Sequence, residues 1–305
     1  MTGFFMLSGF SMYNGYKNRD IMSKDELRRF VSRRAYNILP LYLIIEVYHL
    51  FVDQNPSLWQ KILLMPMQLG LVQSHIGGTW SFLGNDGMWF ISCIFFCYAF
   101  YPFIQKIIQM ASPKFLFMAF AALCLLSIYL PIAVNLSGFG SIYSLPFYRL
   151  IEFVEGCLLA QLIQRKDFCV ISKHALCMAV VLTVIYVAAL TLAHGAEYDY
   201  LFFNMLTVPF FMLLLVLLYC AEYSHKARSP RVLSVTKYLA SLSFVFYMVQ
   251  SFRPWVQAEY IIGLIHYDSN LLRIGISFFI CLFTSIIVNE LVNKPVRKLL
   301  ERKLG

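Results

Sequence analysis

Charged side chains stand at regular spacing inside a long apolar stretch, where ionisable residues are costly and rare. Arg149, Glu152 and Glu155 repeat every three residues, so they share one slowly drifting stripe of a helix. Because lipid cannot satisfy such groups, the stripe is expected to face the protein interior. A structural ion pair within the helix accounts for Arg149 and one glutamate. The second glutamate has no partner in this pair, so a functional role is as open as a structural one.

A cluster of arginines immediately precedes another apolar stretch, at Arg28, Arg29, Arg33 and Arg34. Guanidinium groups bind phosphate oxygens through two parallel hydrogen bonds, so the cluster suits a phosphate-rich ligand. Positive charge at this position also fixes membrane topology and attracts anionic lipid. The two interpretations are compatible with each other.

Other polar residues are weaker candidates for a functional site. Glu46 and His49 share a helical face near the outer end of their span, either as a proton-handling pair or, as that position favours, as an interfacial pair reaching toward lipid headgroups. Arg253 is suited to snorkelling, or to lining a cleft beside Pro254. Eight cysteines show no zinc-site spacing and no disulfide framework, so no metal site is predicted.

The composition indicates what must position these residues. Hydrophobic residues make up 60% of the 305-residue chain and charged residues only 13%, with a mean hydropathy of +0.68. A soluble domain of this length carries about a quarter charged residues. The composition therefore predicts an all-α polytopic membrane protein, and the net charge of +9 is ascribed to the loops beside its spans rather than to nucleic-acid binding.

A transmembrane helix needs about 20 apolar residues. Eight apolar stretches in the sequence reach about this length, whereas two others, 1–13 and 60–73, are too short to cross alone. The stretches that are long enough to cross cover residues 35–53, 87–109, 114–135, 144–164, 175–194, 199–221, 238–256 and 271–293.

The basic residues orient the predicted bundle. Of the 25 lysines and arginines, all but Lys61, Arg149, Arg253 and Arg273 fall in alternate loops and the C-terminal tail. By the positive-inside rule this side, with the C-terminus, is cytoplasmic. The full spans with the short first segment give about nine crossings, and this count predicts a missing N-terminal piece, with an interfacial first helix as the alternative.

Short motifs then indicate a family. In chain order they cover Phe4–Phe10, Arg33–Tyr42, Asn85–Pro102, Pro146–Gly156, Ser241–Gln250 and Asn289–Arg297. Each motif alone is weak, but together they resemble the acyltransferase 3 family of bacterial integral-membrane O-acyltransferases. The sequence departs from the family pattern at Asn37 and Gln250, and Ile94 and Phe95 replace glutamates found in one branch.

The resemblance implies a fold and an activity. It implies a ten-helix core, with residues 1–305 as a single membrane-embedded domain that is truncated at its N-terminus. It also implies transfer of an acyl group, usually acetyl, from acyl-CoA to a hydroxyl of an envelope or exopolysaccharide carbohydrate. The expected location is the bacterial cytoplasmic membrane, with lipid and the carbohydrate acceptor as partners.

The site residues follow from the same resemblance. The family's catalytic histidine lies upstream of Met1, and of the six histidines present only His75 is offered as a substitute. The donor phosphates are expected at Arg29, Arg33 and Arg34, and the substrate path at Trp89, Tyr98, Arg149, Glu152 and Glu155.

Two other hypotheses stay open. A transporter or flippase for a glycan or a lipid-linked substrate fits a helical bundle with charges inside the membrane. The absence of Gly/Pro-broken helices at matching positions in two halves of the sequence weighs against it. The third hypothesis is an inactive, truncated acyltransferase that still folds in the membrane.

Overall fold

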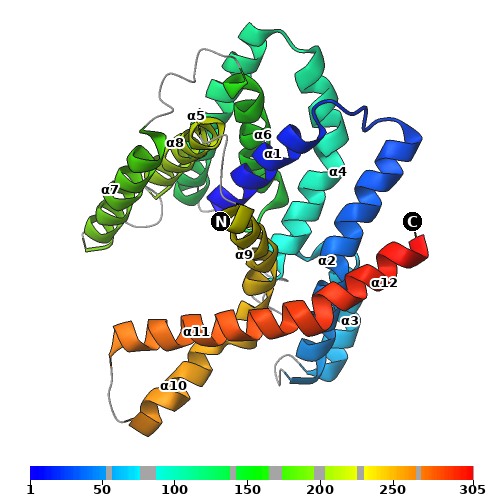
Figure 1. Ribbon diagram of the computed structural model, residues 1–305, viewed down its shortest axis with the longest axis vertical. Helices are drawn as coiled ribbons and strands as arrows, with labels where there is room; N and C mark the ends of the chain where they lie inside the picture. The colour runs from blue at the N-terminus through cyan, green and yellow to red at the C-terminus, as the bar shows by residue number, and fades with distance from the viewer. Residues whose placement is uncertain are drawn as a thin grey trace. The chain divides into compact units, whose positions relative to one another are not determined.

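The computed structural model describes residues 1–52, 57–75, 87–137, 142–164, 174–195, 203–224, 230–265 and 269–304 (Figure 1). Every regular element in these ranges is a helix, as the composition predicts. The chain divides into two compact units. The first comprises Met1–Leu27 and Cys93–Ala227, and the second comprises Arg28–Ser92 and Arg228–Gly305.

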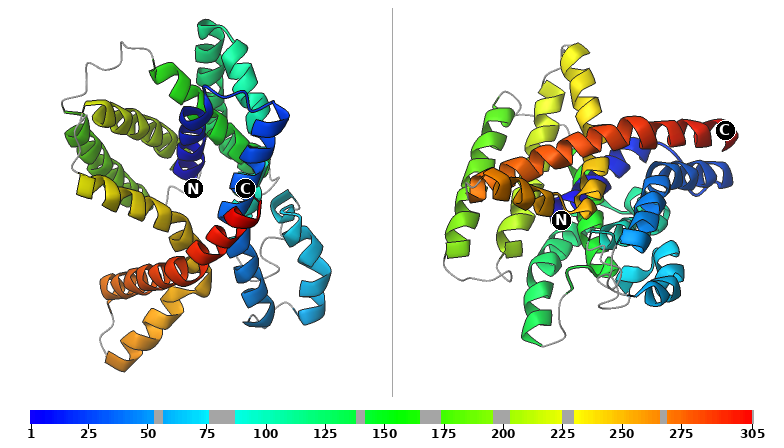
Figure 2. Two further views of the ribbon diagram at one scale, coloured as in Figure 1. Left: turned by 45° about the vertical axis from the view of Figure 1, so that its right-hand side comes forward. Right: turned by 90° about the horizontal axis from the view of Figure 1, so that it is seen from below.

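The first unit is built on contacts among helices far apart in the sequence. Helix α1 packs along α6, α5 packs against α6 and α8, and α7 pairs with α8. Figure 2 shows α7 and α8 lying side by side. The bounds are α1 (Thr2–Tyr16), α4 (Trp89–Met110, which starts in the second unit), α5 (Pro113–Leu136), α6 (Pro146–Ile163), α7 (Ala175–Gly195) and α8 (Phe203–Ser224).

Glycines bring α1 and α6 into backbone contact. A Cβ atom on Gly9 would lie 1.9 Å from the carbonyl oxygen of Phe153, and one on Gly156 would lie 2.0 Å from that of Met6. The thiol of Cys157 donates to the Gly9 carbonyl oxygen at 3.3 Å across the same contact. Small residues permit this approach, which is how helices associate where lipid provides no hydrophobic driving force.

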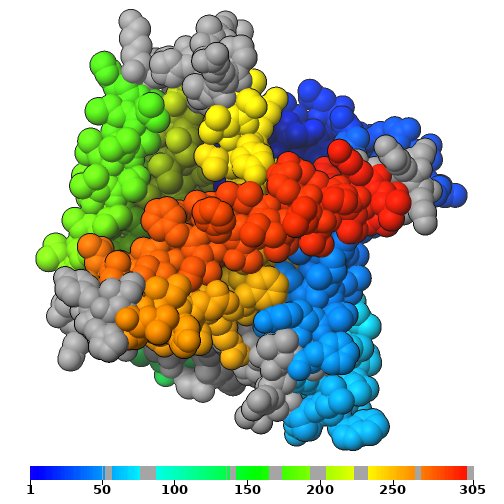
Figure 3. Space-filling view, turned by 60° about the horizontal axis from the view of Figure 1, so that its bottom comes forward, coloured from blue at the N-terminus to red at the C-terminus, as the bar shows by residue number. Residues whose placement is uncertain are grey.

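The second unit contains the long helix α2 and the C-terminal helices. Helix α11 packs against α9 and α10, and Figure 3 shows α11 and α12 as one continuous orange-to-red rod, joined by a π-helical turn at Asn289–Asn293. The bounds are α2 (Lys24–Val52, whose first residues belong to the first unit), α3 (Leu58–Leu69), a 3-10 turn (Gln73–His75), α9 (Pro230–Val249), a 3-10 turn (Gln250–Phe252), α10 (Pro254–Ile265), α11 (Asn270–Val288) and α12 (Lys294–Leu304).

Several helices are long and apolar enough to cross a membrane. Within the described residues there are five, namely Trp89–Met110, Pro113–Val134, Ala175–Leu192, Asn204–Glu222 and Asn270–Leu300. They support a polytopic membrane protein. The count of about nine crossings and the single domain over residues 1–305 stay predictions.

The structure corrects two predicted segments. The continuous span 238–256 is wrong, because α9 ends at Val249 and Arg253 adopts a left-handed conformation with φ 55° and ψ 57° before α10 begins. Helix α10, Pro254–Ile265, also occupies most of the segment that the sequence analysis left between the predicted spans 238–256 and 271–293. The arginine cluster also does not precede its helix, since α2 begins at Lys24 and includes it.

Candidate functional site

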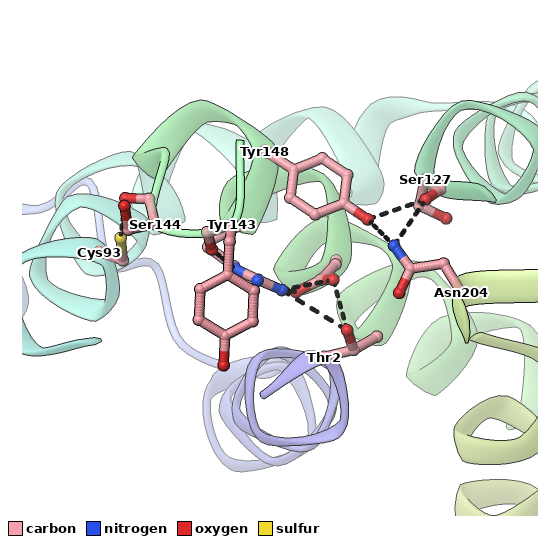
Figure 4. A network of polar contacts seen from close by, with 9 residues as sticks. Thr2, Cys93, Ser127, Tyr143, Ser144, Tyr148 and Asn204 are labelled. Atoms are coloured by element: carbon pink, nitrogen blue, oxygen red, sulfur yellow. Dashed lines mark hydrogen bonds and ion pairs between the residues drawn. The ribbon is translucent and has the colours of Figure 1, made fainter. Parts of the chain in front are cut away.

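A buried ion pair occupies the start of α6 (Figure 4). Arg149 and Glu152 lie one helical turn apart, and one terminal guanidinium nitrogen of Arg149 donates to both carboxylate oxygens of Glu152 at 2.8 Å. Their relative exposures are 2% and 0%. An uncompensated charge in such a place costs several kcal/mol, so each residue depends on the other.

The surroundings of Arg149 satisfy the rest of its guanidinium group. Its Nε donates to the Tyr143 carbonyl oxygen at 2.7 Å. The guanidinium carbon lies 4.8 Å from the ring centroid of Tyr143, 5.1 Å from that of Tyr148 and 5.6 Å from that of Phe5. These aromatic faces favour a desolvated cation, so the site holds Arg149 in one orientation.

Thr2 on α1 completes the ion pair. Its hydroxyl donates to Glu152 at 2.7 Å and lies 3.5 Å from the guanidinium of Arg149. Only the close contact between α1 and α6 brings residues 2 and 152 together. The sequence prediction missed Thr2, because a single threonine in an apolar segment carries no signal of its tertiary partner.

Glu155 lies one turn further along α6 and is the surplus carboxyl group of the stripe. It is 1% exposed, and neither of its oxygens makes a hydrogen bond with a described residue. The nearby Ser127 hydroxyl donates instead to the carbonyl oxygen of Cys124 in its own helix, at 3.1 Å. The predicted inward-facing stripe is therefore confirmed for all three residues, and Glu155 keeps unused hydrogen-bonding capacity.

A second polar cluster lies beside the ion pair and arises from a proline. Pro131 inside α5 has no N–H, so it leaves the carbonyl oxygen of Ser127 without its helical donor. The Tyr148 hydroxyl donates to this oxygen at 2.8 Å, and the Asn204 amide of α8 donates to the same hydroxyl at 2.6 Å. Figure 4 shows these contacts joining α5, α6 and α8. The proline was the available sequence signal for this cluster, although it does not say which residue supplies the donor.

Replacing Tyr148 with phenylalanine should cost about 1–3 kcal/mol of stability, since it leaves a buried carbonyl group poorly satisfied. Adding Pro131→Ala restores the missing N–H donor, so the double variant should unfold at a higher temperature than Tyr148→Phe alone. The control is Tyr129→Phe on the same helix α5, where the side chain is 55% exposed. A melting temperature unchanged by Tyr148→Phe would contradict this account of the cluster.

The remaining substrate-path candidates are Tyr98 and Trp89, each with its own contacts. The Tyr98 hydroxyl is 3.2 Å from the Ser8 hydroxyl, and its ring meets Phe153 edge-on at 6.2 Å. Trp89, in the second unit, is only 4% exposed and packs edge-on against Phe90 at 6.4 Å. The Asn85 and Asp86 part of its motif lies outside the described residues.

The donor candidates share helix α2 of the second unit. Arg29 and Arg33 are exposed, and Arg34 is half-buried with its guanidinium 5.7 Å from the ring centroid of Phe30. Arg29 and Arg33 are four residues apart, so both project from one face of the helix. The structure therefore leaves two arginines on one exposed helical face.

The other candidates of the sequence analysis are also located. His49 is buried at 3% exposure, whereas His75 is exposed at the end of its 3-10 turn. Among the eight cysteines, Cys93 and Cys97 lie one helical turn apart on α4 and are both buried, and the Cys93 thiol donates to the carbonyl oxygen of Ser144 at 3.3 Å. Among the described residues no group of three or more His, Cys, Asp or Glu side chains could hold a metal ion.

A comparison with known protein families gives one finding. A family model described as an acyltransferase domain, that of acyltransferase 3, matches residues 1–290. No curated protein and no solved structure matches the chain. The match agrees with the family indicated by the sequence motifs.

Proposed function

Because the chain belongs to the acyltransferase 3 family, we propose that it transfers an acyl group, acetyl in the simplest case, from acyl-CoA to a carbohydrate hydroxyl. The acceptor is a glycan of the cell envelope or an exopolysaccharide, and the reaction takes place in the bacterial cytoplasmic membrane with the C-terminus in the cytoplasm. The observation that carries the proposal is the family match over residues 1–290. In the reaction the hydroxyl oxygen attacks the thioester carbonyl, an ester C–O bond forms, the C–S bond breaks, and the hydroxyl proton ends on the departing CoA thiol.

The donor end of the proposal rests on helix α2. Coenzyme A carries several phosphates, and Arg29 and Arg33 present two exposed guanidinium groups from one face of that helix. Arg34 adds a third, half-buried one. Guanidinium groups match phosphate geometry better than ammonium groups do, because their donors form a planar fork. These arginines lie at the end of α2 that the charge pattern assigns to the cytoplasm, where acyl-CoA is available.

The acceptor end of the proposal rests on Glu155. Arg149 and Glu152 already satisfy one another, so they serve best to hold the start of α6 in place. Glu155 instead keeps two carboxyl oxygens that bond to no described residue, and a sugar hydroxyl is a suitable hydrogen-bond donor to them. Tyr98, a half-buried side chain of the same unit, contributes aromatic surface of the kind that sugar rings pack against. A place for Trp89 in the substrate path stays a prediction, because its side chain is 4% exposed and belongs to the second unit.

Donor binding is tested by replacing Arg29 and Arg33 together with glutamine. Each charge-assisted hydrogen bond to phosphate contributes about 1.5–3 kcal/mol, so the apparent KM for acetyl-CoA should rise at least tenfold. The kcat should change little, because the phosphates are remote from the reacting carbonyl group. Lysine at both positions should restore part of the affinity, since it keeps the charge but not the fork.

The control for this experiment is Lys24→Gln, which removes one exposed charge from the first turn of the same helix. Membrane insertion is checked by the amount of protein in the membrane fraction. An unchanged KM in the double glutamine variant, with normal insertion, would remove these arginines from the donor site.

A transporter remains the second candidate because of the break between α9 and α10. Discontinuous helices line substrate sites in transporters, and Arg253 interrupts the predicted span in a left-handed conformation. The two functions differ in their product. An acyltransferase leaves label from acetyl-CoA in an ester on the glycan, whereas a transporter moves the glycan without changing it.

A further inference from the structure

A pocket with a volume of about 110 Å³ lies between α2 and α3 in the second unit. Its apolar walls are Leu43 and Val47 from α2 and Met65 and Leu69 from α3. At about 30 Å³ for an atom with the volume of a water molecule, the pocket holds roughly four non-hydrogen atoms. A short acyl group has this size, whereas a sugar ring does not fit.

Polar groups are gathered on the other side of the same pocket. Glu46 and His49 line it from α2, and Lys61 and Gln68 line it from α3. Lys61 is only 1% exposed, and its ammonium group donates to the His49 carbonyl oxygen at 3.1 Å. The pocket therefore has an apolar side and a polar far end, which is closed by Lys61 and His49.

Hydrogen bonds between the two helices fix the shape of the pocket. The Tyr42 hydroxyl, fully buried in α2, donates to the Gln68 carbonyl oxygen at 2.8 Å. Gln73 donates to the Tyr42 hydroxyl at 3.3 Å and to the Met88 carbonyl oxygen at 3.2 Å. With the Lys61 contact, these bonds join α3 to α2 at both ends, so the pocket is formed before any ligand binds.

The pocket also lies at a suitable distance from the donor arginines. Arg29, Arg33, Leu43 and Val47 occupy positions i, i+4, i+14 and i+18 of α2, which fall on one face of a helix. At 1.5 Å per residue, Leu43 is about 15 Å and Val47 about 21 Å along the axis from Arg33. The pantetheine arm of acyl-CoA contains roughly a dozen bonds between phosphate and sulfur, about 14 Å when extended like a polypeptide backbone.

We infer that the pocket between α2 and α3 binds the acyl group of acyl-CoA while Arg29 and Arg33 bind its phosphates, and that its volume suits an acyl chain of about two to four carbons. This inference rests on the proposed function, since it extends the donor site along the same helix. Met65 and Val47 line the part of the pocket that the end of the acyl chain fills, and Lys61 lies at the far end beside His49.

The test is the affinity of the purified protein, in lipid nanodiscs, for CoA and for acetyl-, butyryl- and octanoyl-CoA. The unaltered protein should bind the acetyl and butyryl forms more tightly than the octanoyl form. Met65→Ala and, separately, Val47→Ala enlarge the pocket. Each should shift the ratio of octanoyl-CoA to acetyl-CoA affinity by about tenfold, because one methylene in an apolar pocket changes binding by that factor or more.

The matched control is Leu63→Ala on α3, where the side chain is 78% exposed and does not line the pocket. An unchanged chain-length order in both pocket variants, with CoA still bound through Arg29 and Arg33, would overturn the acyl pocket and leave the proposed function standing. Tightest binding of the octanoyl form by the unaltered protein would also contradict it and would indicate a site for lipid chains. A protein that binds no CoA at all would overturn both proposals.

Discussion

Glu152→Ala is expected to destabilise the protein by about 3–5 kcal/mol, because it leaves the Arg149 guanidinium buried without its counter-charge. The hydroxyl of Thr2 also loses its acceptor, so the contact between α1 and α6 weakens at the same place. The measurement is the temperature at which the detergent-solubilised protein loses its monodisperse elution after heating. Glu259→Ala, at an exposed position of α10, is the control and should unfold like the unaltered protein.

A double variant separates stability from function at this pair. A buried ion pair replaced by apolar residues of similar volume is often neutral or stabilising, so Arg149→Met with Glu152→Leu should recover most of the lost stability. If the pair only holds the start of α6, the double variant recovers acyl transfer as well. Recovered stability without transfer would show that Arg149 or Glu152 also contacts the substrate. A Glu152→Ala protein as stable as the unaltered one would contradict the burial of the pair.

Gly9→Ala is the second change with a large expected effect. The added Cβ would lie 1.9 Å from the carbonyl oxygen of Phe153, and a backbone atom cannot move aside as a flexible side chain does. Helix α1 must therefore shift away from α6, at a cost of about 3 kcal/mol, the upper end of the usual range for overpacking. The shift should also break the hydrogen bond from Thr2 to Glu152.

Gly15→Ala provides the matched control on the same helix. No atom lies within 4 Å of the Cβ that it adds, and alanine favours a helix over glycine by about 1 kcal/mol. We therefore expect Gly15→Ala to be neutral or slightly stabilising in the same thermal measurement. Equal melting temperatures for the two variants would show that α1 does not contact α6 through its backbone.

Residue spacing predicted the part of the site that lies on single helices. The three-residue repeat of Arg149, Glu152 and Glu155 was sufficient to place all three on an inward face, because helical periodicity relates residues close in sequence. The donor arginines were proposed from their clustering and from the family resemblance, and their helix begins earlier than predicted. The family assignment from short motifs was confirmed by the match over residues 1–290.

Contacts between distant segments could not be predicted. Nothing in the sequence pairs Thr2 with Glu152, and hydropathy does not show that Gly9 and Gly156 are close to the facing backbone. The break at Arg253 was also missed, because an apolar window does not register a left-handed residue. Its signal was Pro254, since the residue before a proline disfavours the helical conformation.

The central claim is that the protein moves an acyl group from acyl-CoA to a carbohydrate. The most direct test adds acetyl-CoA with a radiolabelled acetyl group to membranes containing the protein made from its own gene, and follows label in the extracted glycan. We predict label that mild base releases as acetate, and a smaller yield at limiting donor in the Arg29→Gln, Arg33→Gln variant. Glycan without label, in membranes that contain the inserted protein and donor, would contradict the proposed function.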